Sequence, residues 1–82
     1  MRIDPNTMHH PAYRPFSMLG AVACALDKID PGSSLVVTDF VNLHGEKMKR
    51  NKLDATIFKA KGDRVFTVRA SPDAFVVIYR IS

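Results

Sequence analysis

Seven cationic side chains fall within residues 45–64 of the 82-residue chain, against three acidic ones. The rest of the chain carries five cations and five acids, so this one segment accounts for the whole net charge of +4. Lysine and arginine neutralise phosphate groups and release their counterions, but the same residue types also cover solvated helix faces. The cations are Lys47, Lys49, Arg50, Lys52, Lys59, Lys61 and Arg64.

The periodicity of this segment predicts a helix over residues 47–61, closed by Gly62. Leu53, Ile57 and Ala60 recur at i, i+4 and i+7 and mark its buried face. At 100° per residue, one flank points away from that face and carries Lys49, Lys52, Thr56 and Lys59. Asn51 and Ala55 lie near the outermost line, and Asp54 is expected nearer the buried side.

These residue types suit contact with nucleic acid. Arginine forks to a guanine edge, asparagine to an adenine, and threonine contacts a base or a phosphate. Apart from Glu46 and Asp54, no acid balances the lysines at helical spacing, although a solvated or protein-binding face remains the alternative. Arg69, beside the predicted hairpin loop, is a further phosphate contact, whereas Arg64 is a weaker candidate. The predicted nucleic-acid contacts are Lys47, Lys49, Arg50, Asn51, Lys52, Thr56, Lys59 and Arg69.

Other chemistry is poorly supported by the sequence. The adjacent His9 and His10 point to opposite sides of an extended chain and, with His44, lack a partner at metal-ligand spacing. Cys24 is the only cysteine and is interpreted as a small buried hydrophobe. Phosphate-loop and nucleophile-elbow patterns are missing. We therefore expect no enzyme, no metal site and no cofactor.

The elements that would position the basic segment follow from local signals. Residues 1–15 hold three prolines and predict an irregular arm. Ser17 is a candidate N-cap for a first helix that should end near Asp30, before Pro31-Gly32. Residues 35–37 predict a short strand, and residues 40–44 a short second helix closed by Gly45. Residues 64–70 and 74–81 predict a β-hairpin around Ser71-Pro72-Asp73.

This succession resembles the winged helix-turn-helix superfamily over residues 16–81. The resemblance rests on order and spacing, in the segments VTDFVNLHG, NKLDATIFKAKGDR and FTVRASPDAFVVIYRI. It implies an α+β fold with three helices, a short strand and a C-terminal hairpin wing, in a domain of residues 16–82. The sequence departs from the pattern at Gly45-Glu46-Lys47, which stands where a Ser or Thr cap is usual. The first residue of the third helix is therefore undetermined within one helical turn.

The resemblance implies double-stranded DNA as the partner. The third helix would enter the major groove and the wing would contact phosphates, as in a regulator of transcription. The alternative is a protein-interaction module of the same fold, an inhibitor or adaptor that docks on an acidic protein partner. The longest uncharged run, residues 15–26, is too short to span a bilayer, so a cytoplasmic protein is expected.

The first helix is apolar on nearly all sides. Its second face consists of small residues, Gly20, Ala21, Cys24 and Ala25, and needs a cover. We expect a second copy of the chain to pack there, giving a homodimer. The alternative cover is the N-terminal arm folded back over the face.

Overall fold

Ser17 begins the first helix, as its hydroxyl predicts. The computed structural model describes residues 3–4, 7–8, 10–14, 17–38, 45 and 47–82. Helix α1 spans Met18–Leu26, and the Ser17 side chain accepts a hydrogen bond from the Gly20 amide at 3.2 Å. This bond satisfies one of the free amides of the first turn, so the predicted N-cap is confirmed.

The C-terminal end of α1 lies four residues earlier than the sequence predicts. The helix stops at Leu26, not near Asp30, and the amides of Lys28 and Ile29 both turn back to the Ala25 carbonyl. In a longer helix the Leu26 carbonyl would accept the Asp30 amide. It instead accepts from Arg64 Nη1 at 2.9 Å. A side chain distant in the sequence therefore takes the place of the next turn.

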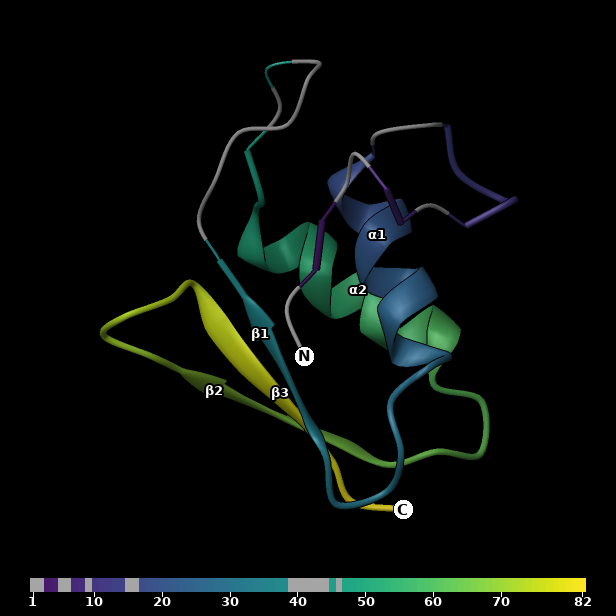
Figure 1. Ribbon diagram of the computed structural model, residues 1–82, viewed down its shortest axis with the longest axis vertical. Coiled ribbons are helices and arrows are strands. Elements are labelled where there is room, and N and C mark those ends of the chain that lie inside the picture. Colours follow the sequence, from purple (N-terminus) through teal and green to yellow (C-terminus); the bar gives the residue numbers. More distant parts are fainter. Residues whose placement is uncertain (1–2, 5–6, 9, 15–16, 39–44, 46) are drawn as a thin grey trace.

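Three strands form one antiparallel sheet in the order β1-β3-β2. Strand β1 spans Ser34–Val37, β2 spans Phe66–Ala70 and β3 spans Val76–Arg80. Ile78 in the middle strand is paired with Leu35 on one side and Val68 on the other. The predicted short strand and hairpin are confirmed. Figure 1 shows the hairpin tip extending away from the two helices.

Helix α2 spans Arg50–Ala60, which is shorter at its start than the predicted range of residues 47–61. Lys49 is extended, with φ −115° and ψ 136°, and its side chain makes no capping bond. Met48 before it is buried in the core at 6% exposure, which holds this part of the chain outside the helix. The predicted inner face is confirmed at Leu53 and Ile57, which are buried, while its third member, Ala60, is half-buried.

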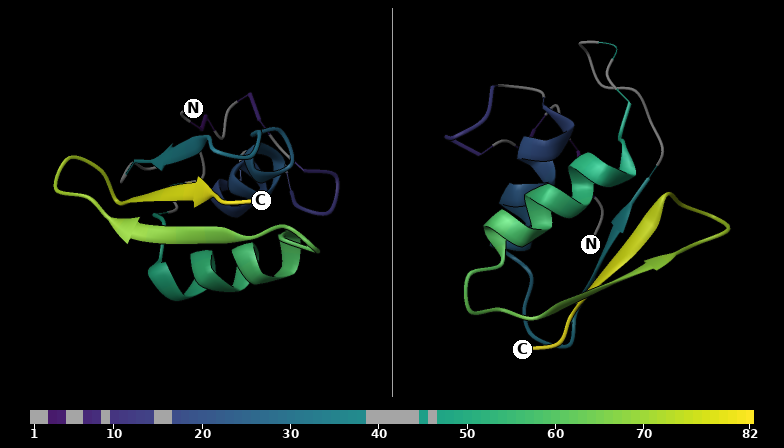
Figure 2. Two further views of the ribbon diagram at one scale, coloured as in Figure 1. Left: turned by 90° about the horizontal axis from the view of Figure 1, so that it is seen from below. Right: turned by 180° about the vertical axis from the view of Figure 1, so that it is seen from behind.

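The core lies between the two helices and the inner face of the sheet. Met18, Val22 and Leu26 of α1 meet Leu53 of α2 and Ile78 of β3, all at 2% exposure or less. Seen from behind, α2 crosses over α1 (Figure 2). The described chain is thus an α+β fold with two helices and three strands. The short helix predicted over residues 40–44 lies outside the described residues.

The second face of α1 is covered within the single chain, which corrects the expected open strip. Ala21 and Ala25 have no exposed surface, and Cys24 is half-buried. A Cβ on Gly20 would lie 2.9 Å from Tyr13 Cβ of the N-terminal arm. The arm also buries Ile3 in the core. Gly20, Ala21, Cys24 and Ala25 therefore do not present the free surface assumed for a homodimer, and the alternative cover accounts for Gly20.

Neither α1 nor α2 has the length and apolar character to cross a bilayer.

Candidate nucleic-acid interface

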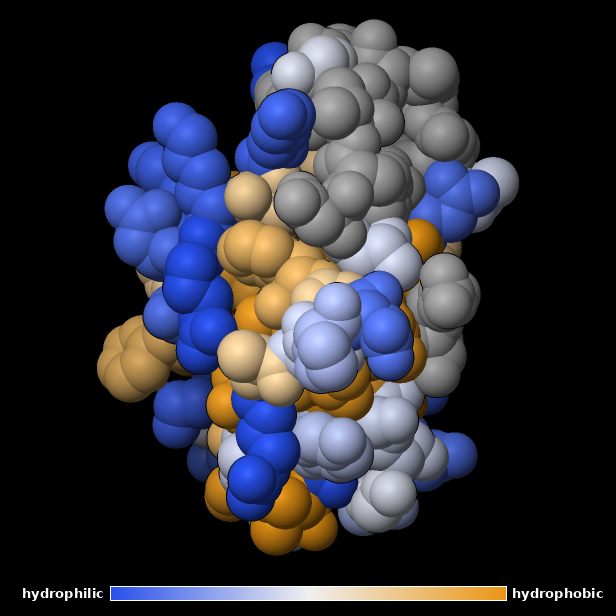
Figure 3. Space-filling model, turned by 90° about the vertical axis from the view of Figure 1, so that its left-hand side faces the viewer, coloured by the Kyte–Doolittle hydropathy of each residue, from blue (hydrophilic) through white to orange (hydrophobic). Residues whose placement is uncertain are grey.

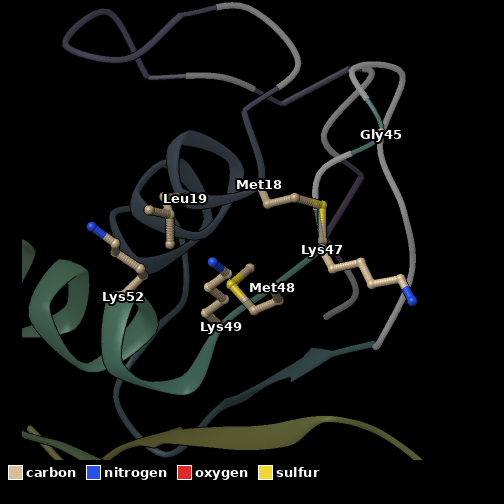
Figure 4. A pocket seen from close by; sticks show the side chains of 7 residues that line it. All are labelled: Met18, Leu19, Gly45, Lys47, Met48, Lys49 and Lys52. Carbon is tan, nitrogen blue, oxygen red and sulfur yellow. The ribbon is translucent and has the colours of Figure 1, made fainter.

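Three predicted lysines lie in the first turn of α2 or in the segment just before it. Lys47, Lys49 and Lys52 are exposed, and they line one hollow of about 570 Å³ with Met18, Leu19, Gly45 and Met48. Figure 4 shows Lys52 extending from α2 toward Leu19 of α1 and Lys49 beside Met48, while Lys47 points away from both. In the described part of the chain none of these lysines has an acidic partner. Their charge is available to an external anion.

Helix stability does not account for these charges. The N-terminal end of a helix carries a partial positive charge, so acids stabilise it and cations do not. The first turn of α2 has no acid, its N-cap residue is Lys49, and Lys52 follows within the turn. A phosphate placed here would meet the lysines and the positive end of the helix dipole, although the Lys52 amide already donates to Asn51 Oδ1.

Arg50 and Asp54 form an ion pair on the same helix, with Nε and Oδ1 at 3.1 Å. Their side chains are 48% and 54% exposed. The expectation that Asp54 would lie toward the buried side is therefore wrong. Because an exposed pair at this spacing contributes only a few tenths of a kcal/mol, its main effect is to cancel one positive charge.

Asn51 is exposed as predicted, but its side-chain oxygen is engaged. Oδ1 accepts a hydrogen bond from the Lys52 amide at 2.9 Å. A two-point contact with adenine needs both the oxygen and the amide nitrogen of an asparagine. Such a contact would require this local bond to open.

Thr56 is the predicted contact that the structure contradicts. It is 4% exposed, and its hydroxyl donates to the Lys52 carbonyl at 3.0 Å. One position before Ile57 and three after Leu53, it lies at the edge of the buried arc of α2, so the packed helix covers it. A back-bonded hydroxyl of this kind is already satisfied and does not face a ligand.

Lys59 and Arg69 are exposed but stand apart from the three lysines. Lys59 is seven residues after Lys52, about 10 Å along the helix axis at 1.5 Å per residue. It lines a second hollow of about 370 Å³ with His10 and Asp27. Arg69 is on β2, opposite Val77 of β3, near the hairpin loop. On the side of the molecule that bears the hairpin, hydrophilic residues run along one margin of an apolar area (Figure 3).

Arg64, the weaker candidate, is a structural residue. Its guanidinium donates to the carbonyls of Leu26, Ala60 and Lys61 and pairs with Asp27 Oδ1 at 2.8 Å. It thereby joins the C-terminal ends of both helices, where carbonyls are left free and a cation is favourable. Sequence spacing alone gave no signal for it, since Leu26 lies 38 residues away.

Metal-ligating residues do not cluster in the described part of the chain. His10 lies 3.7 Å from Asp27 and edge-on to the Tyr13 ring. The other histidines, His9 and His44, lie outside the described residues.

The comparisons with known proteins returned nothing. No family model, curated protein or solved structure matches the chain.

Proposed function

We propose that the protein is a small winged-helix DNA-binding protein that regulates transcription. The observation that carries the proposal is the group of Lys47, Lys49 and Lys52 at the start of α2, without acidic partners and at the helix end where cations are unfavourable. In this arrangement α2 is the third helix of the winged-helix pattern and enters the major groove.

The order of elements supports the proposed fold. A helix, a strand, a second described helix and a hairpin follow one another, and β1 pairs with the second strand of the hairpin. The missing element of the winged-helix pattern would fall on residues 40–44. Arg69 is the hairpin cation nearest the loop, and it is exposed.

A salt titration of binding to random-sequence duplex DNA tests the proposal. Lys47, Lys49, Lys52, Lys59 and Arg69 give up to five phosphate contacts, and each contributes about −0.9 to the slope of log K against log salt. We expect a slope of about −3 to −4.5 by fluorescence anisotropy. A slope near zero, or no binding at about 50 mM salt, would contradict the proposal.

One substitution pair makes the test specific to α2. Lys52→Ala should lower affinity for all sequences alike and reduce the slope by about one unit. Lys28→Ala removes the same charge from the turn after α1 and should leave the slope unchanged. Equal slopes for these two variants would show that binding depends on net charge and not on α2.

A further inference from the structure

DNA binding leaves the floor of the lysine-lined hollow unexplained. Met18 and Met48 line this floor but are only 2% and 6% exposed, so its accessible apolar surface comes mainly from Leu19 of α1, which is half-buried. Phosphates and base edges are polar and gain nothing from such a surface. A volume of about 570 Å³ is within the range of ligand pockets, which runs from about 300 to 1,000 Å³.

The described residues at the rim of the hollow carry only positive charge. Lys49 and Lys52 lie beside the apolar floor, and Lys47 lines the outer margin of the hollow and points away from it (Figure 4). No aspartate or glutamate is among the described residues that line the hollow. Lysine stems add apolar surface beneath their ammonium groups. The lysines approach from α2 and the segment before it, while Leu19 faces them from α1 (Figure 4).

We propose that this hollow docks an acidic amphipathic segment of a protein partner. One or two apolar side chains of the segment pack on Met18, Leu19 and Met48, and its carboxylates meet the three lysines. Three cations are more than a small molecule with one carboxylate would neutralise. They match a peptide segment that carries several carboxylates. Methionine side chains adapt to varied apolar shapes, which suits a peptide site.

Occupation of the hollow has a consequence for DNA. The segment would use the same lysines as the phosphates, so the two ligands exclude one another. The partner would therefore release DNA from the protein in proportion to its own affinity.

The probe is a synthetic helical peptide of about 15 residues, with Leu and Phe on one face and Asp and Glu on the other. One control peptide has the same composition with the apolar residues scattered, and another has Asn and Gln in place of the acids. Because one buried Leu or Phe is worth a factor of about ten or more, the amphipathic acidic peptide should bind about ten-fold tighter than either control. Equal binding of the scattered peptide would overturn the proposal, because it would show attraction by charge alone.

Variants separate this site from the DNA surface. Leu19→Ala should weaken the peptide about five-fold or more while leaving the DNA salt slope unchanged, because Leu19 carries no charge. Lys52→Ala should weaken both ligands, and Lys28→Ala neither. The proposal of a separate apolar floor is refuted if Leu19→Ala weakens peptide and DNA binding equally, or if it changes neither.

Two safeguards keep the outcome decisive. Thermal unfolding establishes that Leu19→Ala is folded, and if it is not, the smaller change Leu19→Val replaces it, with an expected loss of about two- to three-fold for the acidic peptide and none for DNA. Peptide binding is measured without DNA, so a failed DNA titration refutes the proposed function alone. A peptide that binds by the expected pattern but does not displace DNA refutes the competition.

Discussion

The two ends of α2 carry the same kind of charge and use it in opposite ways. At the C-terminal end, Arg64 gives its guanidinium to three carbonyls and to Asp27, and its side chain is only 23% exposed. At the N-terminal end, Lys49 and Lys52 are exposed, next to a helix terminus that repels cations. One end therefore holds the fold together, and the other retains charge that the fold does not use.

The largest effect should come from breaking the C-terminal end. In Arg64→Ala the Leu26 and Ala60 carbonyls lose the guanidinium and Asp27 loses its ion pair, whereas the Lys61 carbonyl keeps the Arg64 backbone amide. We expect the free energy of unfolding to fall by about 2–3 kcal/mol. Urea unfolding followed by circular dichroism measures it. Arg64→Lys keeps the charge but cannot donate to several carbonyls at once. Its free energy of unfolding should therefore lie between those of the parent and Arg64→Ala. A loss below about 0.5 kcal/mol in Arg64→Ala would mean that these bonds are not what joins the helices.

Local signals predicted the parts of the fold that depend on local contacts. Ser17 is a cap because its hydroxyl reaches an amide three residues on, and Leu53 and Ile57 are buried because their spacing puts them on one face. The same reasoning failed where a residue distant in the sequence determines a helix end or covers a helix face. Helix α1 ends at Leu26 because Arg64 occupies its carbonyl, and the cover over Gly20 is Tyr13 of the arm.

For the candidate site, the sequence predicted which cations are exposed but not which groups contact them or lie beside them. Composition located the lysines, and the structure leaves Lys47, Lys49 and Lys52 exposed. A projection at 100° per residue cannot tell how wide the buried arc is, because that width depends on what packs against the helix. This is why Thr56 was placed on the wrong side of the boundary. The apolar floor under the lysines was also missed, since α1 and the segment before α2 meet there only in three dimensions.

A smaller effect should come from adding free charge to the N-terminal end. Asp54→Asn removes the partner of Arg50, so the guanidinium becomes available to a phosphate. We expect the DNA salt slope to steepen by up to about one unit and the stability to change by less than about 0.5 kcal/mol. Asp63→Asn removes the same charge beyond the C-terminal end of α2 and is the matched control. If the two variants steepen the slope equally, the gain reflects net charge and Arg50 does not contact DNA.

The smallest effect is expected at Thr56, between the two ends. Thr56→Val keeps the shape of the side chain and removes only the hydroxyl that donates to the Lys52 carbonyl. That carbonyl also accepts the helical bond of the Thr56 amide, so we expect stability to stay within about 0.5 kcal/mol of the parent. DNA affinity should not change, because a side chain with 4% exposure cannot reach a base or a phosphate. Anisotropy titrations of the parent and Thr56→Val on one duplex compare them directly. A clear loss of affinity in a fully folded Thr56→Val would place this flank of α2 against the DNA and restore the wider contact surface that the helical projection predicts.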